Sequence, residues 1–221
     1  MRTRLVLLGI LSLLMLSAVA MAVVDDFTHS LHSQLSLIAI PAVPLNPHPS
    51  ETQYGLPPVF DGISVDGRLS RWDSVGKGTY TYDENDPALF GNMLIGEGYW
   101  LNMGAADTMS YQGLTDTDTM HIWISIPKAG WSLIGNPFSF NYYWPNAKVT
   151  DGNETVSLEL ACQAPRNWLS STMNWWDETG QGTRDVGLPD DACYTEELYP
   201  WHGYWIVTKV DKLALILESP L

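Results

Sequence analysis

The sequence is poor in basic side chains. Its 221 residues hold 11 lysines and arginines against 25 aspartates and glutamates, which gives a formal net charge of -14. Such a chain repels nucleic acid and anionic lipid at long range, so we expect neither as a partner. Acidity of this kind serves solubility more often than metal binding, so the charge alone predicts no site.

Catalytic motifs are also lacking. The five histidines include no HExxH pair and no metal-spaced neighbours, and there is no Gly-x-Ser-x-Gly elbow. Paired carboxylates occur, but only their geometry could identify a glycosidase pair. We therefore expect a non-enzymatic protein with no catalytic residue. A secreted hydrolase with an unfamiliar site is the alternative.

Long apolar runs are confined to the start of the chain. Arg2 and Arg4 precede an apolar run at 5–16, and 20–22 reads Ala-Met-Ala, a small-x-small cleavage site. This pattern predicts a signal peptide over 1–22 and a secreted or cell-surface protein; an uncleaved anchor is the competing interpretation. No later stretch approaches the roughly 20 apolar residues of a membrane span.

Cysteine is scarce. Cys162 and Cys193 are the two in the chain, and in an oxidising compartment such a pair normally forms a bridge. Closing a loop of 31 positions would contribute about 3–4 kcal/mol in the chain-entropy model. We expect a disulfide that stabilises the second half of the chain; a catalytic or metal-binding thiol is the alternative interpretation.

What the chain does have is an internal duplication. Residues 72–79, Trp-Asp-Ser-Val-Gly-Lys-Gly-Thr, match 176–183, Trp-Asp-Glu-Thr-Gly-Gln-Gly-Thr, at an offset of 104. The triplet Gly-Tyr-Trp recurs at 98–100 and 203–205, and the apolar run 35–41 matches 131–137 at an offset of 96. Matched blocks in the same order indicate two copies of one structural unit.

The strand-like alternation within these blocks predicts the fold class and its boundaries. We expect a mostly β protein: two tandem antiparallel β repeats, forming a pseudo-duplicated sandwich or a split barrel, with short helical turns near 57–63 and 157–162. The predicted segments are a leader at 23–34, repeat 1 at 35–113, a link at 114–130 that includes a strand at 121–126, and repeat 2 at 131–221.

The shared motif has a structural explanation. A hairpin turn needs positions with positive φ, which the Gly-x-Gly after Trp-Asp can supply. Asp73 and Asp177 can accept backbone N–H bonds within that turn. Gly98 and Gly203 predict a bulge or a close approach of backbone, and the Tyr-Trp that follows places one ring on each face of a strand.

These stretches resemble a family. The pattern Trp-x-Leu-Ile-x-x-Pro at 131–137, the Trp-Asp turn, and Gly-x-Gly-Tyr-Trp at 96–100 are similar to tandem β-rich repeats of secreted and surface proteins of bacteria and archaea. The second copy departs from the pattern with Trp201 and His202 before its Gly-Tyr-Trp, and the first copy has Leu35 where tryptophan is usual. The resemblance implies an accessory or architectural module and carries over no catalytic residue.

Aromatic residues are the strongest candidates for binding, since the chain has ten tryptophans and ten tyrosines. Trp72, Trp100, Trp176 and Trp205 recur in both copies, so we assign them to the core. Those outside the repeated positions could stack on sugar rings, pack, or contact another partner. They are Trp144, Trp168, Trp175, Trp201, Tyr142 and Tyr143. Expected partners are therefore glycans or other surface proteins.

Acidic turns are the remaining candidates. Asp83, Glu84 and Asp86 crowd one turn, and Asp116 lies two residues from Asp118. Calcium takes such oxygen ligands, but neither segment follows the twelve-residue calcium loop. We expect no cofactor, with calcium as the alternative.

Overall fold

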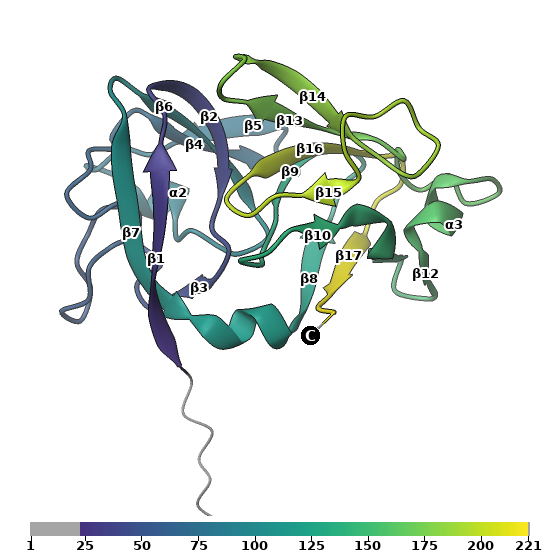
Figure 1. The fold of residues 1–221 in the computed structure, drawn as a ribbon, viewed down its shortest axis with the longest axis horizontal. Coiled ribbons are helices and arrows are strands. Elements are labelled where there is room, and N and C mark those ends of the chain that lie inside the picture. Colours follow the sequence, from purple (N-terminus) through teal and green to yellow (C-terminus); the bar gives the residue numbers. More distant parts are fainter. Residues whose placement is uncertain (1–22, 221) are drawn as a thin grey trace, which may run out of the picture.

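The computed structural model describes residues 23–220, so the predicted signal peptide lies outside the described residues. The fold is mostly β, as predicted, with two short α-helices in this part of the chain. The strands form antiparallel sheets and none of the sheets within 23–220 closes into a barrel. The two copies lie side by side (Figure 1).

The first copy consists of two sheets. One has the order β1-β7-β3 and the other β2-β6-β4-β5. Their bounds are β1 Val24–Leu31, β2 Gln34–Ala39, β3 Val43–Pro44, β4 Leu69–Asp73, β5 Gly78–Thr81, β6 Gly98–Met103 and β7 Asp107–Leu114, with α2 at Pro87–Phe90. The turn expected near 57–63 is present but is not helical, and the short helix of this copy is α2 instead.

The second copy repeats this arrangement with additions. Its sheets have the orders β12-β11-β17-β8 and β14-β13-β16-β9, and β10 pairs with β15. The bounds are β8 His121–Ile126, β9 Gly130–Gly135, β10 Tyr142–Tyr143, β11 Lys148–Thr150, β12 Thr155–Ser157, α3 Leu158–Cys162, β13 Met173–Asp177, β14 Gly182–Val186, β15 Glu197–Leu198, β16 Gly203–Thr208 and β17 Leu213–Glu218. The two 3-10 helices are η1 Thr115–Thr119 and η2 Trp144–Asn146. Ser157 caps α3 by accepting from the N–H of Leu160, and the helical turn predicted near 157–162 is confirmed.

Two segments predicted to lie outside the repeats pair with strands of the repeats. The predicted leader contains β1, which pairs along its whole length with β7, and the predicted linking strand is β8, which pairs in the same way with β17. Phe27, His29 and Leu31 face the interior of the first copy as Ile122, Ile124 and Ile126 face that of the second. The alternation of β1 is weaker because one of its inward positions is a histidine, whereas all three inward positions of β8 are isoleucines.

Each copy has its own hydrophobic core. Ile38, Leu69 and Tyr99 are fully buried in the first, and Ile134, Met173 and Tyr204 in the second. Tyr99 and Tyr204 are equivalent, and each hydroxyl accepts a backbone N–H five residues upstream, from Leu94 at 2.7 Å and from Tyr199 at 2.5 Å. Burial raises the pKa of both phenols. The tyrosine of Gly-Tyr-Trp is therefore a core residue with a satisfied hydroxyl.

The hairpin motif works differently from the prediction in one respect. Positive φ falls on Lys77 (52°) and Gln181 (47°) rather than on the glycines that flank them. Gly76 is required for space, because a Cβ there would lie 2.5 Å from Asp73 Oδ2. Asp73 Oδ1 accepts the N–H of Val75 at 2.8 Å, which confirms the predicted role of the aspartate. Bonds from the N–H groups of Gly76 and then Val75 lower the pKa of this carboxyl.

The copies meet across a pseudo-twofold junction. The N–H of Ala39 donates to the carbonyl of Trp201 at 2.8 Å, and the N–H of the equivalent Gly135 donates to the carbonyl of Gly96 at 2.9 Å. The ring pairs are reciprocal too: Trp72 with Trp205 (5.4 Å between centroids) and Trp176 with Trp100 (5.9 Å). The repeated motifs therefore build the contact that joins the copies.

Candidate functional site

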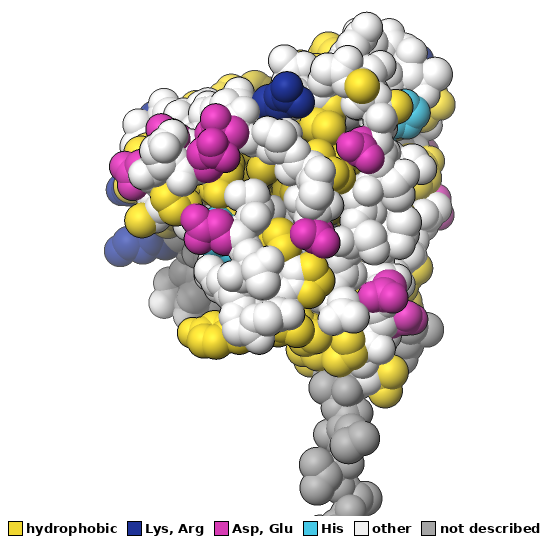
Figure 2. All heavy atoms as spheres, turned by 90° about the vertical axis from the view of Figure 1, so that its left-hand side faces the viewer, with side chains coloured by type: hydrophobic (Ala, Val, Ile, Leu, Met, Phe, Trp, Pro, Cys, Tyr) yellow, Lys and Arg dark blue, Asp and Glu magenta, His cyan; other side chains and the backbone are white. Residues whose placement is uncertain are grey.

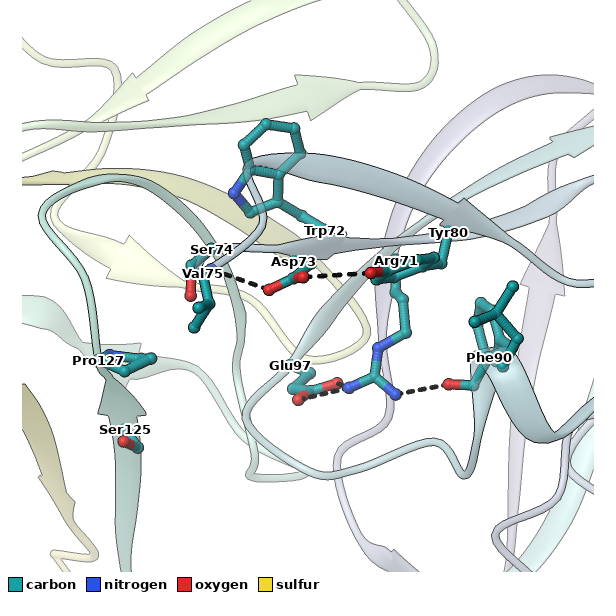
Figure 3. Close-up of a pocket in the computed structure, with 11 residues that line it drawn as sticks. Arg71, Trp72, Asp73, Ser74, Val75, Tyr80, Phe90, Glu97, Ser125 and Pro127 are labelled. Atoms are coloured by element: carbon teal, nitrogen blue, oxygen red, sulfur yellow. Dashed lines mark hydrogen bonds and ion pairs between the residues drawn. The ribbon is translucent and has the colours of Figure 1, made fainter.

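A pocket lies between the first copy and β8, and Figure 3 shows its lining. Its volume is about 400 Å³. Arg71 of β4 crosses it and donates to the carbonyl of Phe90 at 2.7 Å and to both carboxylate oxygens of Glu97 at 2.9 and 2.6 Å. Glu97 also accepts the hydroxyl of Tyr99 at 2.9 Å. The charged groups of this pocket already bond to one another. We therefore interpret the Arg71–Glu97 pair as a stabilising contact rather than as a reactive centre.

The equivalent positions of the second copy hold aromatic residues instead. Trp175 stands where the first copy has Arg71, and His202 where it has Glu97. The two rings lie 5.2 Å apart, and Trp175 also contacts Tyr199 at 5.9 Å and Tyr194 at 6.2 Å. An ion pair in one copy is thus replaced by an aromatic cluster in the other.

A groove opens beside this cluster, with a volume of about 380 Å³. Tyr194 is 62% exposed and Tyr143 is 40% exposed. The Tyr143 hydroxyl donates to Glu196 at 2.9 Å, which raises the pKa of that phenol. The guanidinium of Arg184 lies 5.0 Å from the centroid of Tyr194. Exposed rings beside carboxylates suit a ligand that has both apolar faces and hydrogen-bonding groups.

The structure separates the predicted aromatic candidates. Trp144, Trp168 and Tyr142 are buried in the core of the second copy, so they are not surface platforms. Trp201 lies half-buried in the junction, stacked on His29 at 4.9 Å. Of the six, only Trp175 and Tyr143 lie at the groove or its neighbouring cluster.

The repeated tryptophans, which were assigned to the core, are only half-buried. Trp100, Trp176 and Trp205 line a pocket of about 230 Å³ on one side of the junction. Their periodic recurrence indicated packing and gave no sign of a cavity. The one sequence feature that could have indicated the cavity is Leu35, which stands where the second copy has Trp131.

The predicted disulfide is absent, and both thiols are free. Cys162 ends α3 and faces a pocket of about 550 Å³ lined also by Leu188 and Asp191, while Cys193 packs over Gly187. The two cysteines line different pockets, Cys162 beside Ser157 and Cys193 beside Tyr194. Burial raises the pKa of Cys162 to about 12.

The acidic turns hold backbone in place. Asp83 Oδ1 accepts from the N–H of Asn85 at 2.8 Å, and Asp66 accepts from the N–H of Glu84 at 2.9 Å. Asp118 accepts from both the N–H and the hydroxyl of Ser139. Within residues 23–220 no three His, Cys, Asp or Glu side chains gather as metal ligands. On the face shown in Figure 2 the carboxylates are scattered rather than gathered.

Comparison of the chain with protein-family models, curated proteins and solved structures gave no match. No helix within 23–220 is long and apolar enough to cross a membrane.

Proposed function

We propose that the protein is an exported, non-enzymatic binding module that acts at the cell surface in an adhesive or accessory role. One observation carries this proposal: the residues shared by the copies are used in the turns and the junction, while the positions that differ expose rings. Arg71 and Glu97 tie the first copy together, whereas their counterparts Trp175 and His202 pack against each other in the second. Trp175 also contacts Tyr194, whose exposed ring lines the groove.

A carbohydrate ligand is the second candidate. The half-exposed rings of Tyr143 and Tyr194 beside Glu196 offer apolar faces next to hydrogen-bond acceptors. Sugars present both apolar faces and hydrogen-bonding groups. This groove therefore suits a glycan better than the pocket of the first copy does, where the ion pair is already satisfied.

The test uses purified protein on a glycan array, with light scattering to measure self-association. Tyr194→Ala is expected to weaken surface or glycan binding without lowering the melting temperature. Tyr54→Ala is the matched control, because Tyr54 is fully exposed and lies outside the groove. Hydrolysis of a glycan or a peptide bond by the purified protein would overturn the non-enzymatic proposal.

A further inference from the structure

The junction is symmetric in its backbone but not in its surface. On one side lies the 230 Å³ pocket lined by Leu37, Trp100, Asn174, Trp175, Trp176, Thr183 and Trp205. The alternation of β13 places Asn174 and Trp176 on the face that lines this pocket. The ring of Trp175 packs on the opposite face, against Tyr199 and His202. The apolar walls are therefore Leu37 and three indoles.

The equivalent place in the other half is covered by a side chain of the protein. Trp131 sets its ring 6.0 Å from that of Trp205, and its carbonyl accepts the indole N–H of Trp72 at 2.8 Å. The residue equivalent to Trp131 is Leu35, which has no ring to place over Trp100. The pocket is thus the half of the junction in which the covering indole is missing.

The hydrogen bonding of the two halves differs in the same way. Trp176 is equivalent to Trp72, but its indole nitrogen is buried without a partner in the described structure. The carbonyl of Leu35 accepts a long bond from Gln181 Nε2 at 3.4 Å instead. The open half is therefore incomplete in both packing and hydrogen bonding.

The open half also has a carboxylate at a position where the closed half has a hydroxyl. In the closed half Ser70 and Thr81 form a neutral cross-strand pair, with 2.9 Å between their hydroxyls. Their counterparts are Asn174, which lines the pocket, and Asp185, which accepts from the Asn174 amide at 2.6 Å. No lysine or arginine lines the pocket. The Asp185 carboxylate, which is bonded to the pocket-lining Asn174, and the net charge of -14 both favour a cationic occupant.

We propose that this pocket binds a quaternary ammonium group, with the cation against the indole rings and Asp185 as the nearby counter-charge. This inference rests on the proposed binding role and names its ligand. Indole faces attract cations through their quadrupole, and recognition of quaternary ammonium by aromatic cages uses this attraction. The rings of Trp100 and Trp176 stand at 71° to each other, so they form two walls of a box rather than one flat platform. The volume is below the roughly 300–1,000 Å³ of sites for drug-sized ligands, which suits a single small group.

The first experiment titrates the full chain with choline chloride, followed by tryptophan fluorescence and calorimetry. The control ligand is 3,3-dimethylbutan-1-ol, which has the shape of choline without its charge, in buffer matched for ionic strength. Saturable binding of choline, with the neutral analogue at least roughly tenfold weaker, is expected. Equal binding of both, or binding of neither, overturns the proposal.

Variants then locate the site. Leu35→Trp restores the residue of the other copy and is expected to abolish choline binding with the protein still folded. Asp185→Asn keeps an acceptor for Asn174 while removing the charge, and is expected to weaken binding roughly tenfold. Thr81→Asn, at the matched position of the closed half, is the control and should leave binding unchanged. Unaltered choline binding in both Leu35→Trp and Asp185→Asn contradicts the site.

Two further arms separate the alternatives. Binding to phosphatidylcholine vesicles but not to phosphatidylglycerol vesicles would identify the ligand as a lipid headgroup. Binding of free choline without binding to either kind of vesicle would identify it as a free solute, and both results support the proposal. If methyl glucoside binds in the pocket and choline does not, the pocket is a sugar site and the proposal is overturned. If the protein binds a surface or a glycan but does not bind choline, this inference alone is contradicted. If the protein hydrolyses a glycan or a peptide bond, the proposed function is contradicted.

Discussion

Gly98 and Gly203 face each other across the junction of the two copies. A Cβ on Gly203 would lie 3.3 Å from the Cα of Gly98 and 3.1 Å from the carbonyl oxygen of Ile38. A Cβ on Gly98 would lie 2.6 Å from the carbonyl oxygen of Ile134, the residue equivalent to Ile38. The predicted close approach of backbone is confirmed, and it occurs between the copies.

Alanine at these glycines should destabilise the protein. The added methyl groups would meet backbone, which cannot move aside as a flexible side chain can. We expect Gly98→Ala to lower the free energy of unfolding by about 1–3 kcal/mol, with a comparable or smaller loss for Gly203→Ala. Chemical denaturation measures both. Gly104→Ala is the control, since nothing lies within 4 Å of a Cβ there; equal losses in all three variants would contradict the close approach.

The hairpin makes a separate prediction about neighbouring glycines. Gly76→Ala would push a methyl group against the carboxylate of Asp73, whereas Gly78→Ala meets nothing within 4 Å. Between them, Lys77 has a positive φ of 52°. We expect Gly76→Ala to lower the melting temperature, Gly78→Ala to leave it nearly unchanged, and Lys77→Gly to raise stability by up to about 1 kcal/mol. A larger loss at Gly78 than at Gly76 would refute this account of the turn.

Acid should weaken the contact between β1 and the second copy. Burial, followed by the charges of His202 and His32, lowers the pKa of His29 from 6.5 to about 4. The folded state thus favours the neutral ring. Its contribution is complete above pH 6.5 and is lost as the pH falls from 6.5 towards 4. The loss is at most about 3 kcal/mol, and less where solvent screens the partly buried ring.

Unfolding free energies measured between pH 4 and 8 check this, with His29→Phe as the variant. Phenylalanine keeps an aromatic ring for Trp201 to stack on, so the variant should lose much of the decline between pH 6.5 and 4. His121→Phe is the control, because His121 is exposed. An undiminished decline in His29→Phe would contradict the assignment.

The thiols should react at different rates. Cys162 has a pKa of about 12 through burial, so only about one thiol in 10⁴ is ionised at pH 8. Cys193 is less buried, although burial and Asp191 also raise its pKa. Alkylation with iodoacetamide followed by mass spectrometry should find two free thiols, with Cys193 modified first. A peptide containing both cysteines linked by a disulfide would contradict the structure.

The parts of the fold that repeat were the parts the sequence could predict. The repeated blocks marked the strands correctly because both copies must form the same hairpin. These blocks are Trp72 with Gly-Tyr-Trp at 98–100, and Trp176 with Gly-Tyr-Trp at 203–205. The register agrees as well: Ser70 pairs with Thr81 as Asn174 pairs with Asp185. β1 was missed because His29, a polar residue, occupies one of its inward positions, and its pairing partner lies about 80 residues away.

The site was harder to predict because it depends on contacts between the copies. A tryptophan that recurs in both copies indicates packing. The repeat pattern does not show whether a neighbouring side chain covers its ring. Leu35 was recognised as a departure from the repeated pattern, but its consequence required the position of Trp131 over Trp205. Trp144 and Trp168 were misplaced for the opposite reason: residues unique to one copy can also fill its core, and both are buried in the core of the second copy.

We infer that the repeated motifs join the two copies into one cooperative unit. Hydrogen exchange of the amides of Ala39 and Gly135, which donate across the junction to Trp201 and Gly96, tests this most directly. Both should exchange only through global unfolding, with the same free energy as the buried amide of Tyr99 in one core and of Tyr204 in the other. Exchange of either junction amide at a free energy well below that of the cores would show that the copies separate before they unfold, and would contradict the claim.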